Sequence, residues 1–400
     1  MTKHCVFLFI VIKALTIKTA TAQTGVKGTI WDVPGIDETP AFKTMAVDSA
    51  IGIIYQGLPY KQHAQSVFAY YATPGTISGN RSLDKHLPAV VLVHGGGGTA
   101  FREWALMWAK KGYAAIAMDL RGNGPERKHL ENGLEETNGQ TPYFDVTPDL
   151  HDQWLYQAVA NVLLAHNLIR QFPEIDSNRI AITGISWGGV ITCMMAGLDN
   201  RYKAAVPVYG CGYLWECGNM AKAVAGISLQ NQETWIKQYD PSNYIGKAGM
   251  PVLFINGAND VHFWLTAYAH TYALVRNRYL CIKVGMKHSH HYGWANDEIF
   301  TFINHLFNNT PPLPVIKDFR ITNGQVTASI SNASDSVQSF LNYTTDTTSL
   351  PEKRKWESIR VSVKSNKINC PVAPAGAVVW YLSLLDGNGL QSSGPLQFLN

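Results

Sequence analysis

The chain of 400 residues has almost no excess of charge of either sign. It contains 33 basic and 29 acidic side chains, and three of the lysines but none of the acids lie within the first 22 residues. The remainder therefore carries 30 basic and 29 acidic side chains. It also lacks the basic stripe by which nucleic-acid-binding proteins neutralise phosphates, so nucleic acid is not expected as a partner.

Long hydrophobic runs are also missing. The run Cys5 to Ile12 is too short to cross a membrane, and two lysines interrupt the apolar stretch that continues it. A basic start, a short apolar centre and the small residues Ala20-Thr21-Ala22 are typical of a secretory signal peptide. We therefore predict a leader over residues 1–22, cleaved near Ala22–Gln23, a secreted or periplasmic protein, and no membrane partner.

Cysteine is scarce, and its spacing excludes the common zinc sites. None of the five cysteines that follow the predicted leader forms a closely spaced metal-binding set. Cys211 and Cys217 are near enough to close a small loop, either as a disulfide in an oxidising compartment or as two free thiols. No metal and no cofactor are predicted.

Apolar segments alternate with helical patterns over most of the chain. Residues 51–56 and 66–72 alternate apolar and polar side chains, which predicts an antiparallel hairpin at a sheet edge. Further strands are predicted at 89–93, 113–118, 180–185 after a polar turn at 176–179, 204–208, 252–255 and 279–284. Helices are predicted at 103–111, 150–172, 190–198, 261–276 and 294–307. This order predicts an α/β fold with a mostly parallel, doubly wound sheet.

Two segments do not follow the alternation. Residues 122–148 and 209–249 are expected to form pocket walls, because they follow strand ends, where open α/β sheets bind ligands. The proline-rich segment 310–314 predicts a stiff linker. Residues 315–400 are rich in Ser, Thr, Asn and Val and predict a small all-β sandwich of the immunoglobulin or fibronectin type. The domains are thus expected at 23–309 and 315–400.

The sequence Thr-Gly-Ile-Ser-Trp-Gly at 183–188 places Ser186 between glycines at the end of an apolar strand and the start of a helix. Such a turn exposes a nucleophilic serine to a base and a substrate. The alternative is a serine in an ordinary tight turn. The context of strand, elbow and helix favours the nucleophile.

Candidates for the acid and the base follow in chain order. Asp260 lies just beyond a predicted strand, with a helix N-cap as its alternative role. His288 follows the next strand, so the order is Ser, Asp, His. His290 and His291 stand close by and could be the base instead or line the pocket, and the three histidines could alternatively hold a metal. Spacing from the strand favours His288.

The oxyanion of a tetrahedral intermediate needs backbone amide donors. The glycine-rich sequence His94 to Gly98 follows the strand that supplies one such donor in this architecture. Gly96, Gly97 and the amide of Trp187 are the candidates. The alternatives are a flexible turn or a phosphate loop, and the latter is disfavoured because no Walker lysine follows. The segment 119–124 is expected to be structural.

Taken together, H-G-G-G-G, G-I-S-W-G-G, G-A-N-D and G-M-K-H resemble the α/β-hydrolase superfamily over residues 50–308. The sequence M-D-L-R-G-N-G is similar to the acetyl xylan esterase and dienelactone-hydrolase-related branch of that superfamily. Dienelactone hydrolases carry a cysteine where this chain has Ser186, which favours an ester or peptide substrate. The resemblance implies no metal and no cofactor.

The sequence therefore predicts a secreted serine esterase that removes short acyl groups, most simply acetyl, from carbohydrate. Trp215, Trp235 and Trp264 could stack on sugar rings or could be core residues. One alternative is a prolyl-oligopeptidase-like serine peptidase. The other is a non-catalytic glycan-binding protein on a hydrolase scaffold.

Overall fold

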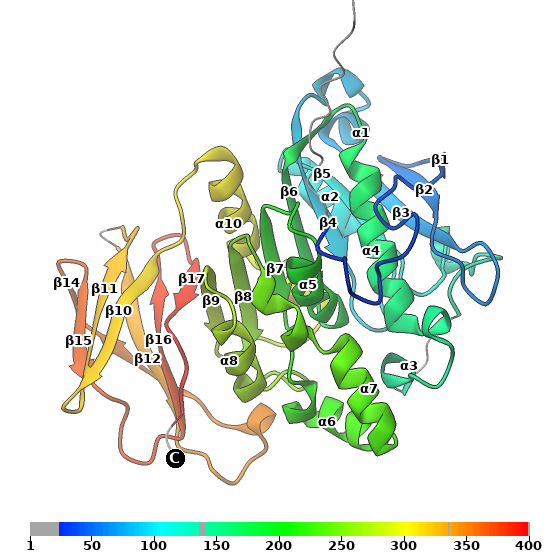
Figure 1. Ribbon diagram of the computed structural model, residues 1–400. Helices are drawn as coiled ribbons and strands as arrows, with labels where there is room; N and C mark the ends of the chain where they lie inside the picture. The colour runs from blue at the N-terminus through cyan, green and yellow to red at the C-terminus, as the bar shows by residue number, and fades with distance from the viewer. Residues whose placement is uncertain (1–23, 136–140, 335, 399–400) are drawn as a thin grey trace, which may run out of the picture.

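The computed structural model describes residues 24–135, 141–334 and 336–398 (Figure 1). The predicted leader, residues 1–22, lies outside the described residues. A central mixed sheet is flanked by helices, and two smaller all-β sheets lie beside it, formed by the end of the chain. Within the described residues, no helix combines the length and apolar character needed to cross a membrane.

The central sheet has nine strands in the order β1-β2-β3-β5-β4-β6-β7-β8-β9. They are β1 (Phe42–Val47), β2 (Ala50–Gln56), β3 (Ser66–Ala72), β4 (Leu87–Val93), β5 (Ala114–Met118), β6 (Ile175–Ile185), β7 (Ala204–Val208), β8 (Val252–Gly257) and β9 (Arg278–Lys283). The strands from β5 to β9 are parallel to one another, whereas β1, β2 and β3 are antiparallel. The predicted α/β class with a mostly parallel sheet is confirmed. β1 was not predicted, because most of its residues are exposed and carry no buried pattern.

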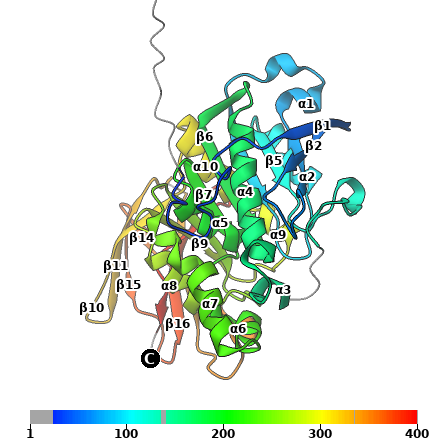
Figure 2. The same ribbon diagram turned by 45° about the vertical axis from the view of Figure 1, so that its right-hand side comes forward.

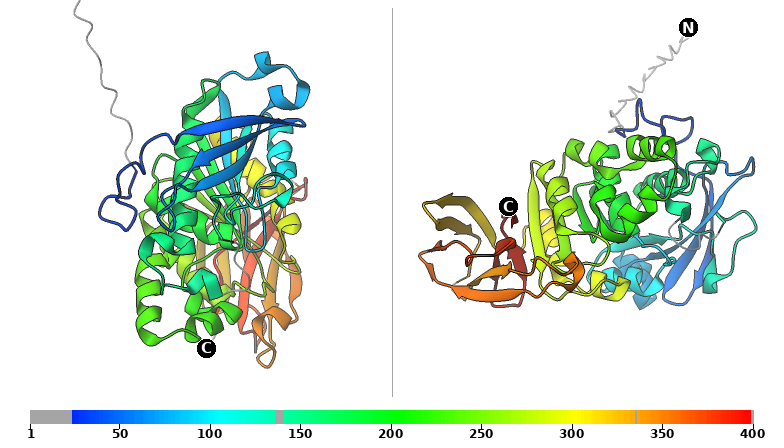
Figure 3. Two further views of the ribbon diagram at one scale, coloured as in Figure 1. Left: turned by 90° about the vertical axis from the view of Figure 1, so that its right-hand side faces the viewer. Right: turned by 90° about the horizontal axis from the view of Figure 1, so that it is seen from below.

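Helices cover both faces of this sheet. The main ones are α2 (Arg102–Lys110), α4 (Trp154–Arg170), α5 (Trp187–Leu198), α8 (Leu265–Ala273) and α10 (Asp297–Asn308). The rings of Trp108 on α2 and Phe300 on α10 lie 5.9 Å apart, so these two helices share one face. α4 and α5 lie on the opposite face (Figures 2 and 3). Because each parallel strand is buried on both sides, its sequence is a continuous apolar run.

The polar segment 176–179 is part of strand β6 and not a turn before it. Leu87 of β4 pairs with Ile175, but Ala89 already pairs with Ile180, so the intervening residues bulge out of the register. The Asp176 carboxylate accepts hydrogen bonds from the backbone amide of Asn178 and from Arg179 Nε, at 3.0 and 2.8 Å. Local polar contacts therefore hold a bulge where the sequence suggested a turn.

The two segments that break the alternation carry short helices. α3 (Thr141–Phe144) lies in the first, and α6 (Gly218–Ala225) and α7 (Leu229–Tyr239) lie in the second. In Figure 1 all three lie together at one end of the sheet. The remaining short helices are α1 (Pro74–Ser78) and α9 (His290–Trp294).

The last part of the chain forms two antiparallel sheets, in the orders β10-β11-β15-β14 and β13-β12-β16-β17, with β18 paired to β16. Their strands are β10 (Val315–Thr322), β11 (Gln325–Ser331), β12 (Gln338–Thr344), β13 (Glu357–Val361), β14 (Val363–Lys364), β15 (Lys367–Pro371), β16 (Val379–Leu385), β17 (Gln391–Ser393) and β18 (Gln397–Phe398). These sheets enclose a core of their own. The predicted small all-β unit is confirmed, and we call residues 315–398 the β-unit.

The segment predicted to be a linker packs against the protein. We call the central sheet and the helices that cover it the α/β part. Leu313, among the prolines of the segment, is 4% exposed and belongs to the core of the α/β part. The β-unit is therefore joined to the α/β part by a segment that is anchored in that part.

Candidate active site

Ser186 lies on a sharp turn between β6 and α5. Its backbone has φ 59° and ψ −118°, which is strained for a residue with a side chain and typical of a nucleophile held out of its strand. The turn needs glycine at Gly188, because a Cβ there would lie 2.0 Å from the carbonyl oxygen of Val93. Residues with side chains could not bring α5 this close to β4.

The structure brings Ser186, His288 and Asp260 together. The Ser186 Oγ and His288 Nε2 atoms are 3.0 Å apart, and the His288 Nδ1 and Asp260 Oδ2 atoms are 2.7 Å apart. A carboxylate accepts hydrogen bonds only, so Nδ1 carries the imidazole proton and the lone pair of Nε2 faces the serine hydroxyl. This is the arrangement in which an imidazole can remove the serine proton.

Asp260 is fixed from both of its oxygens. Oδ2 accepts from His288, and Oδ1 accepts from the backbone amides of His262 and Phe263, at 2.8 Å each. Helix α8 begins only at Leu265, with Trp264 as its N-cap. The alternative role of Asp260 as the N-cap of this helix is therefore wrong, and its carboxylate instead closes the turn that precedes the helix.

Aromatic rings surround His288, and the sequence analysis did not identify them. The Tyr209 ring lies 4.4 Å from the His288 ring, and the Phe263 ring is nearly parallel to it at 6.0 Å. The Tyr209 hydroxyl also donates to the carbonyl oxygen of Lys287, at 2.7 Å. Tyr209 has φ 57°, an uncommon value for a bulky residue, and directly follows β7. That place at the carboxyl end of a neighbouring strand was the available sequence signal.

The other two histidines lie in different environments. The Gly95 amide donates to His290 Nε2 at 2.9 Å, and this contact occupies the lone pair that a base would need. Burial, with the nearby His94 and His288, lowers the pKa of His290 to about 4. His291 is exposed on α9 beside Tyr292. Of the three histidines, His288 is thus the one in contact with Ser186.

His94 holds the glycine-rich segment against the next strand end. Its Nδ1 donates to the Gly95 carbonyl oxygen at 2.7 Å, and its Nε2 accepts from the Leu120 amide at 2.9 Å. Burial lowers the pKa of His94, which keeps it neutral as these two contacts require. The carboxylate of Asp119 accepts from the amides of Arg121 and Asn123. The expected structural role of the 119–124 segment therefore has a geometric basis.

The three oxyanion candidates differ in their positions. Gly96 is exposed and lies beside the elbow, because a Cβ there would be 3.0 Å from Cδ1 of Trp187 and 2.9 Å from the Tyr143 hydroxyl. Gly97 is also exposed and has φ 69°. Trp187 is the first residue of α5 and directly follows Ser186. Gly96 and Trp187 thus adjoin the turn at Ser186, whereas an added Cβ at Gly97 would meet no atom within 4 Å.

Aromatic residues from the segments 122–148 and 209–249 meet next to the turn at Ser186. Tyr143 packs 4.6 Å from the Trp187 ring, Phe144 packs 4.7 Å from Trp235, and Trp235 Nε1 donates to the Tyr143 carbonyl oxygen at 3.0 Å. Trp235 is 1% exposed, so its suggested role in stacking on a sugar is wrong. Trp215 is 36% exposed and remains available for stacking.

No bonded cysteine pair is present among residues 24–135, 141–334 and 336–398. Cys211 and Cys217 are buried thiols whose sulfur atoms lie 3.8 Å apart, so the open choice is resolved in favour of free thiols. The same residues contain no group of three or more His, Cys, Asp or Glu side chains arranged to hold a metal ion.

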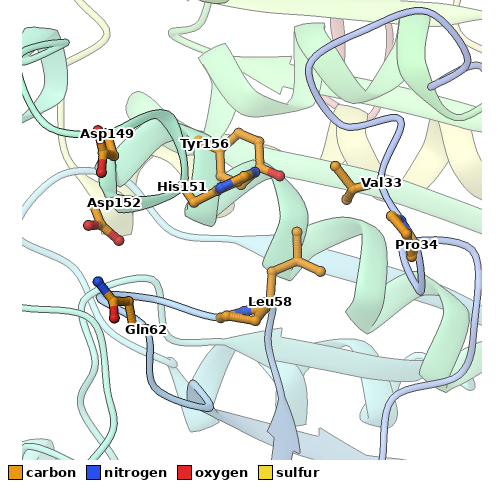
Figure 4. Close-up of a pocket in the computed structure, with 9 residues that line it drawn as sticks. Val33, Pro34, Leu58, Gln62, Asp149, His151, Asp152 and Tyr156 are labelled. Carbon is orange, nitrogen blue, oxygen red and sulfur yellow. The ribbon is translucent and has the colours of Figure 1, made fainter.

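A cavity of about 390 Å³ lies between the N-terminal segment and the start of α4 (Figure 4). Polar side chains lie on one side of it and apolar side chains on the other. It is lined by Val33, Pro34, Leu58, Pro59, Gln62, Asp149, His151, Asp152 and Tyr156. Ser186, His288 and Asp260 do not line it, so it is distinct from the space around Ser186.

The mixed sheet and the serine elbow at the end of β6 define the α/β-hydrolase class. Within this class the chain belongs to the acetyl xylan esterase (AXE1) family, whose model matches residues 29–244. That match includes His94 to Gly98 and Ser186 and ends before Asp260 and His288.

Individual relatives are more distant. The chain is 33% identical over 124 residues to the uncharacterized peptidase YuxL of Bacillus subtilis, covering 30% of this chain and 16% of that protein. It is 25% identical over 214 residues to the acetyl esterase Axe7A of Xylanibacter ruminicola, covering 49% of this chain and 46% of that protein. The chain thus spans less than half the length of each of these two relatives.

Among solved structures, the acetyl xylan esterase from Paenibacillus sp. R4 has the same fold. It superposes with a TM-score of 0.53 at 19% identity, covering 68% of this chain and 90% of that one. Acetyl xylan esterase 1 from Thermoanaerobacterium sp. also reaches 0.53, at 18% identity, covering 68% and 92%.

The contact between His290 and Gly95 leads to a testable prediction. His290→Ala should lower kcat for 4-nitrophenyl acetate roughly 10-fold with little change in KM, because the glycine-rich segment loses its support. His288→Ala should lower kcat by about 10⁴-fold. His291→Ala, an exposed position, is the matched control and should match the wild type. A loss in His290→Ala as large as in His288→Ala would contradict this assignment.

The same variant has an expected pH signature. The pKa of His290 is about 4 in the fold and about 6.5 in the unfolded chain, so unfolding takes up a proton between these values. The stability that neutral His290 contributes is complete above pH 6.5 and is lost as the pH falls towards 4. As the pH falls from 6.5 to 4, the free energy of unfolding measured in urea should decrease more steeply for the wild type than for His290→Ala.

Proposed function

We propose that the protein is a serine esterase that cleaves short acyl esters through a covalent acyl-enzyme. Ser186 Oγ attacks the ester carbonyl carbon while His288 Nε2 takes the serine proton. His288 then gives that proton to the leaving alcohol, and the C–O bond of the ester breaks. Water, activated by the same imidazole, attacks the acyl carbon and releases the acid and free Ser186.

Asp260 holds His288 in the required tautomer and stabilises the imidazolium that forms when the serine proton is transferred. The observation that carries this proposal is the pair of contacts at 3.0 and 2.7 Å that link the three residues. The backbone amides of Trp187, Gly96 and Gly97 are proposed to bind the oxyanion. Gly95 is left out because its amide already donates to His290.

We propose acetylated carbohydrate as the substrate class. Membership of the acetyl xylan esterase family supports this proposal. Trp215, exposed beside Tyr213 within the segment 209–249, offers a ring on which a sugar could stack. We further propose that residues 1–22 are a cleaved leader and that the protein is exported to where such polymers occur. The proposed domains are 23–309 and 315–400.

The experiment is a comparison of three substrates with purified protein: 4-nitrophenyl acetate, acetylated xylan and a dipeptide 4-nitroanilide. We expect the wild type to release acetate from the first two substrates and Ser186→Ala to release it about 10⁴-fold more slowly. Cleavage of the nitroanilide in preference to the esters would instead support the peptidase alternative, which the similarity to YuxL favours. Tight binding of acetylated xylan without acetate release would support the glycan-binding alternative.

A further inference from the structure

The β-unit covers the last strand of the central sheet. β9 pairs with β8 on one side only, so its other edge would expose unpaired backbone groups. The Ile282 amide donates to Ser393 Oγ at 2.9 Å, and the Ile282 carbonyl oxygen accepts from the Tyr381 hydroxyl at 3.1 Å. Side chains of β16 and β17 therefore form hydrogen bonds with backbone groups of β9 that a neighbouring strand could otherwise pair with.

Strand β16 is buried on both of its faces. Trp380, Leu382 and Leu384 point into the core of the β-unit, whereas Val379 and Tyr381 belong to the core of the α/β part. Successive side chains of a strand point in opposite directions, so a single strand contributes to both cores. The two parts of the chain thus share one continuous apolar interface.

Buried polar contacts also cross this interface. Glu298 of α10 is 1% exposed, and its Oε1 accepts from Lys283 Nζ at 2.7 Å and from the Gln391 amide at 2.8 Å. The Tyr272 hydroxyl of α8 accepts from the Leu396 amide at 2.9 Å. Such paired, desolvated groups fix the orientation of one part on the other.

The β-unit also reaches the turn that carries Asp260. The 345–356 loop connects β12 to β13 and extends from the β-unit towards the α/β part (orange in Figure 1). Asn259 Nδ2 donates to the Arg354 carbonyl oxygen at 2.8 Å and to the Glu352 carbonyl oxygen at 3.4 Å. Asn259 immediately precedes Asp260, so this contact holds the turn from outside, 95 residues away in the chain.

We propose that the β-unit positions the catalytic acid, and that Asn259 is the positioning residue through which it acts. Strands β8 and β9 lead directly into the segments that carry Asp260 and His288, and both strands lie on the β-unit side of the sheet. With the 345–356 loop holding Asn259, the Asp260 carboxylate stays within reach of His288. The inference rests on the proposed function, because it concerns the geometry of the same three residues.

The test is Asn259→Ala in the full chain, with Asn167→Ala as the matched control. Asn167 Nδ2 likewise donates to two backbone carbonyl oxygens of another segment, those of Ile36 and Glu38, at 2.8 Å each. Asn167, however, lies on α4. Asn259→Ala should lower kcat for 4-nitrophenyl acetate about 10-fold, with KM within about twofold and an almost unchanged melting temperature. Asn167→Ala should lower the melting temperature and leave kcat unchanged.

Two results would overturn the inference. One is a kcat of Asn259→Ala within about twofold of the wild type while Asp260→Asn is inactive. The other is a loss of kcat in Asn167→Ala equal to that in Asn259→Ala, which would make the effect one of general stability. Full activity of Asp260→Asn would instead mean that the proposed catalytic mechanism itself is wrong, and the positioning role would fail with it.

Discussion

Replacing Ser186 by alanine should lower kcat for 4-nitrophenyl acetate by about 10⁴-fold or more, because the hydroxyl proposed to form the acyl-enzyme is removed. Alanine keeps the Cβ that the elbow already accommodates and removes only the hydroxyl that contacts His288. The fold should therefore remain intact. The residual rate would measure what the oxyanion donors and substrate binding contribute without a nucleophile.

The measurement pairs initial rates with covalent labelling by a fluorophosphonate, followed by mass spectrometry. The wild type should gain one label on Ser186, and Ser186→Ala should gain none. Ser228→Ala is the control, because Ser228 Oγ accepts from the Asn231 backbone amide at the start of α7. A Ser186→Ala variant that still turns over ester and still takes the label would show that the nucleophile lies elsewhere.

Replacing Asp260 by asparagine should lower kcat by about 10⁴-fold while the structure stays the same. An asparagine oxygen can still accept from the His262 and Phe263 amides, so the turn should persist. Its NH₂ group, however, would donate towards His288 Nδ1 and favour the tautomer that carries its proton on Nε2. That proton would then face Ser186 Oγ, and the imidazole could not act as a base.

The control for this prediction is Asp176→Asn, which changes the same functional group in the bulge of β6, beside Arg179. We expect its kcat to match the wild type. Thermal unfolding of both variants would show whether either change perturbs the fold. A kcat for Asp260→Asn within tenfold of the wild type, with the fold intact, would argue against Asp260 as the acid.

Much of the site could be predicted from the sequence, because its parts follow strand ends. Ser186 directly follows β6, and Asp260 and His288 lie in the segments that follow β8 and β9. The carboxyl ends of parallel strands meet at one edge of a sheet. The choice among the three histidines could not be settled in this way. It depends on the Gly95 amide, 195 residues before His290, which occupies the ring nitrogen of that residue.

The β-unit also has features that the sequence predicts and others that only the structure shows. Its composition predicted an all-β fold, but the sequence did not predict how it packs against the α/β part. Strand β16 is buried along almost its whole length. Two cores meet on its two faces, and neither core is encoded in the local pattern.

The sequence by itself determined the α/β order of elements, the glycine-bounded elbow and the chain order of serine, acid and histidine. These features depend on residues that are neighbours in the chain, where periodicity and steric limits act directly. Only the tertiary structure decided which histidine contacts Ser186, that Trp235 is a core residue, and that Asn259 is held by the 345–356 loop. Each of these depends on contacts between segments far apart in the chain, which no local pattern records.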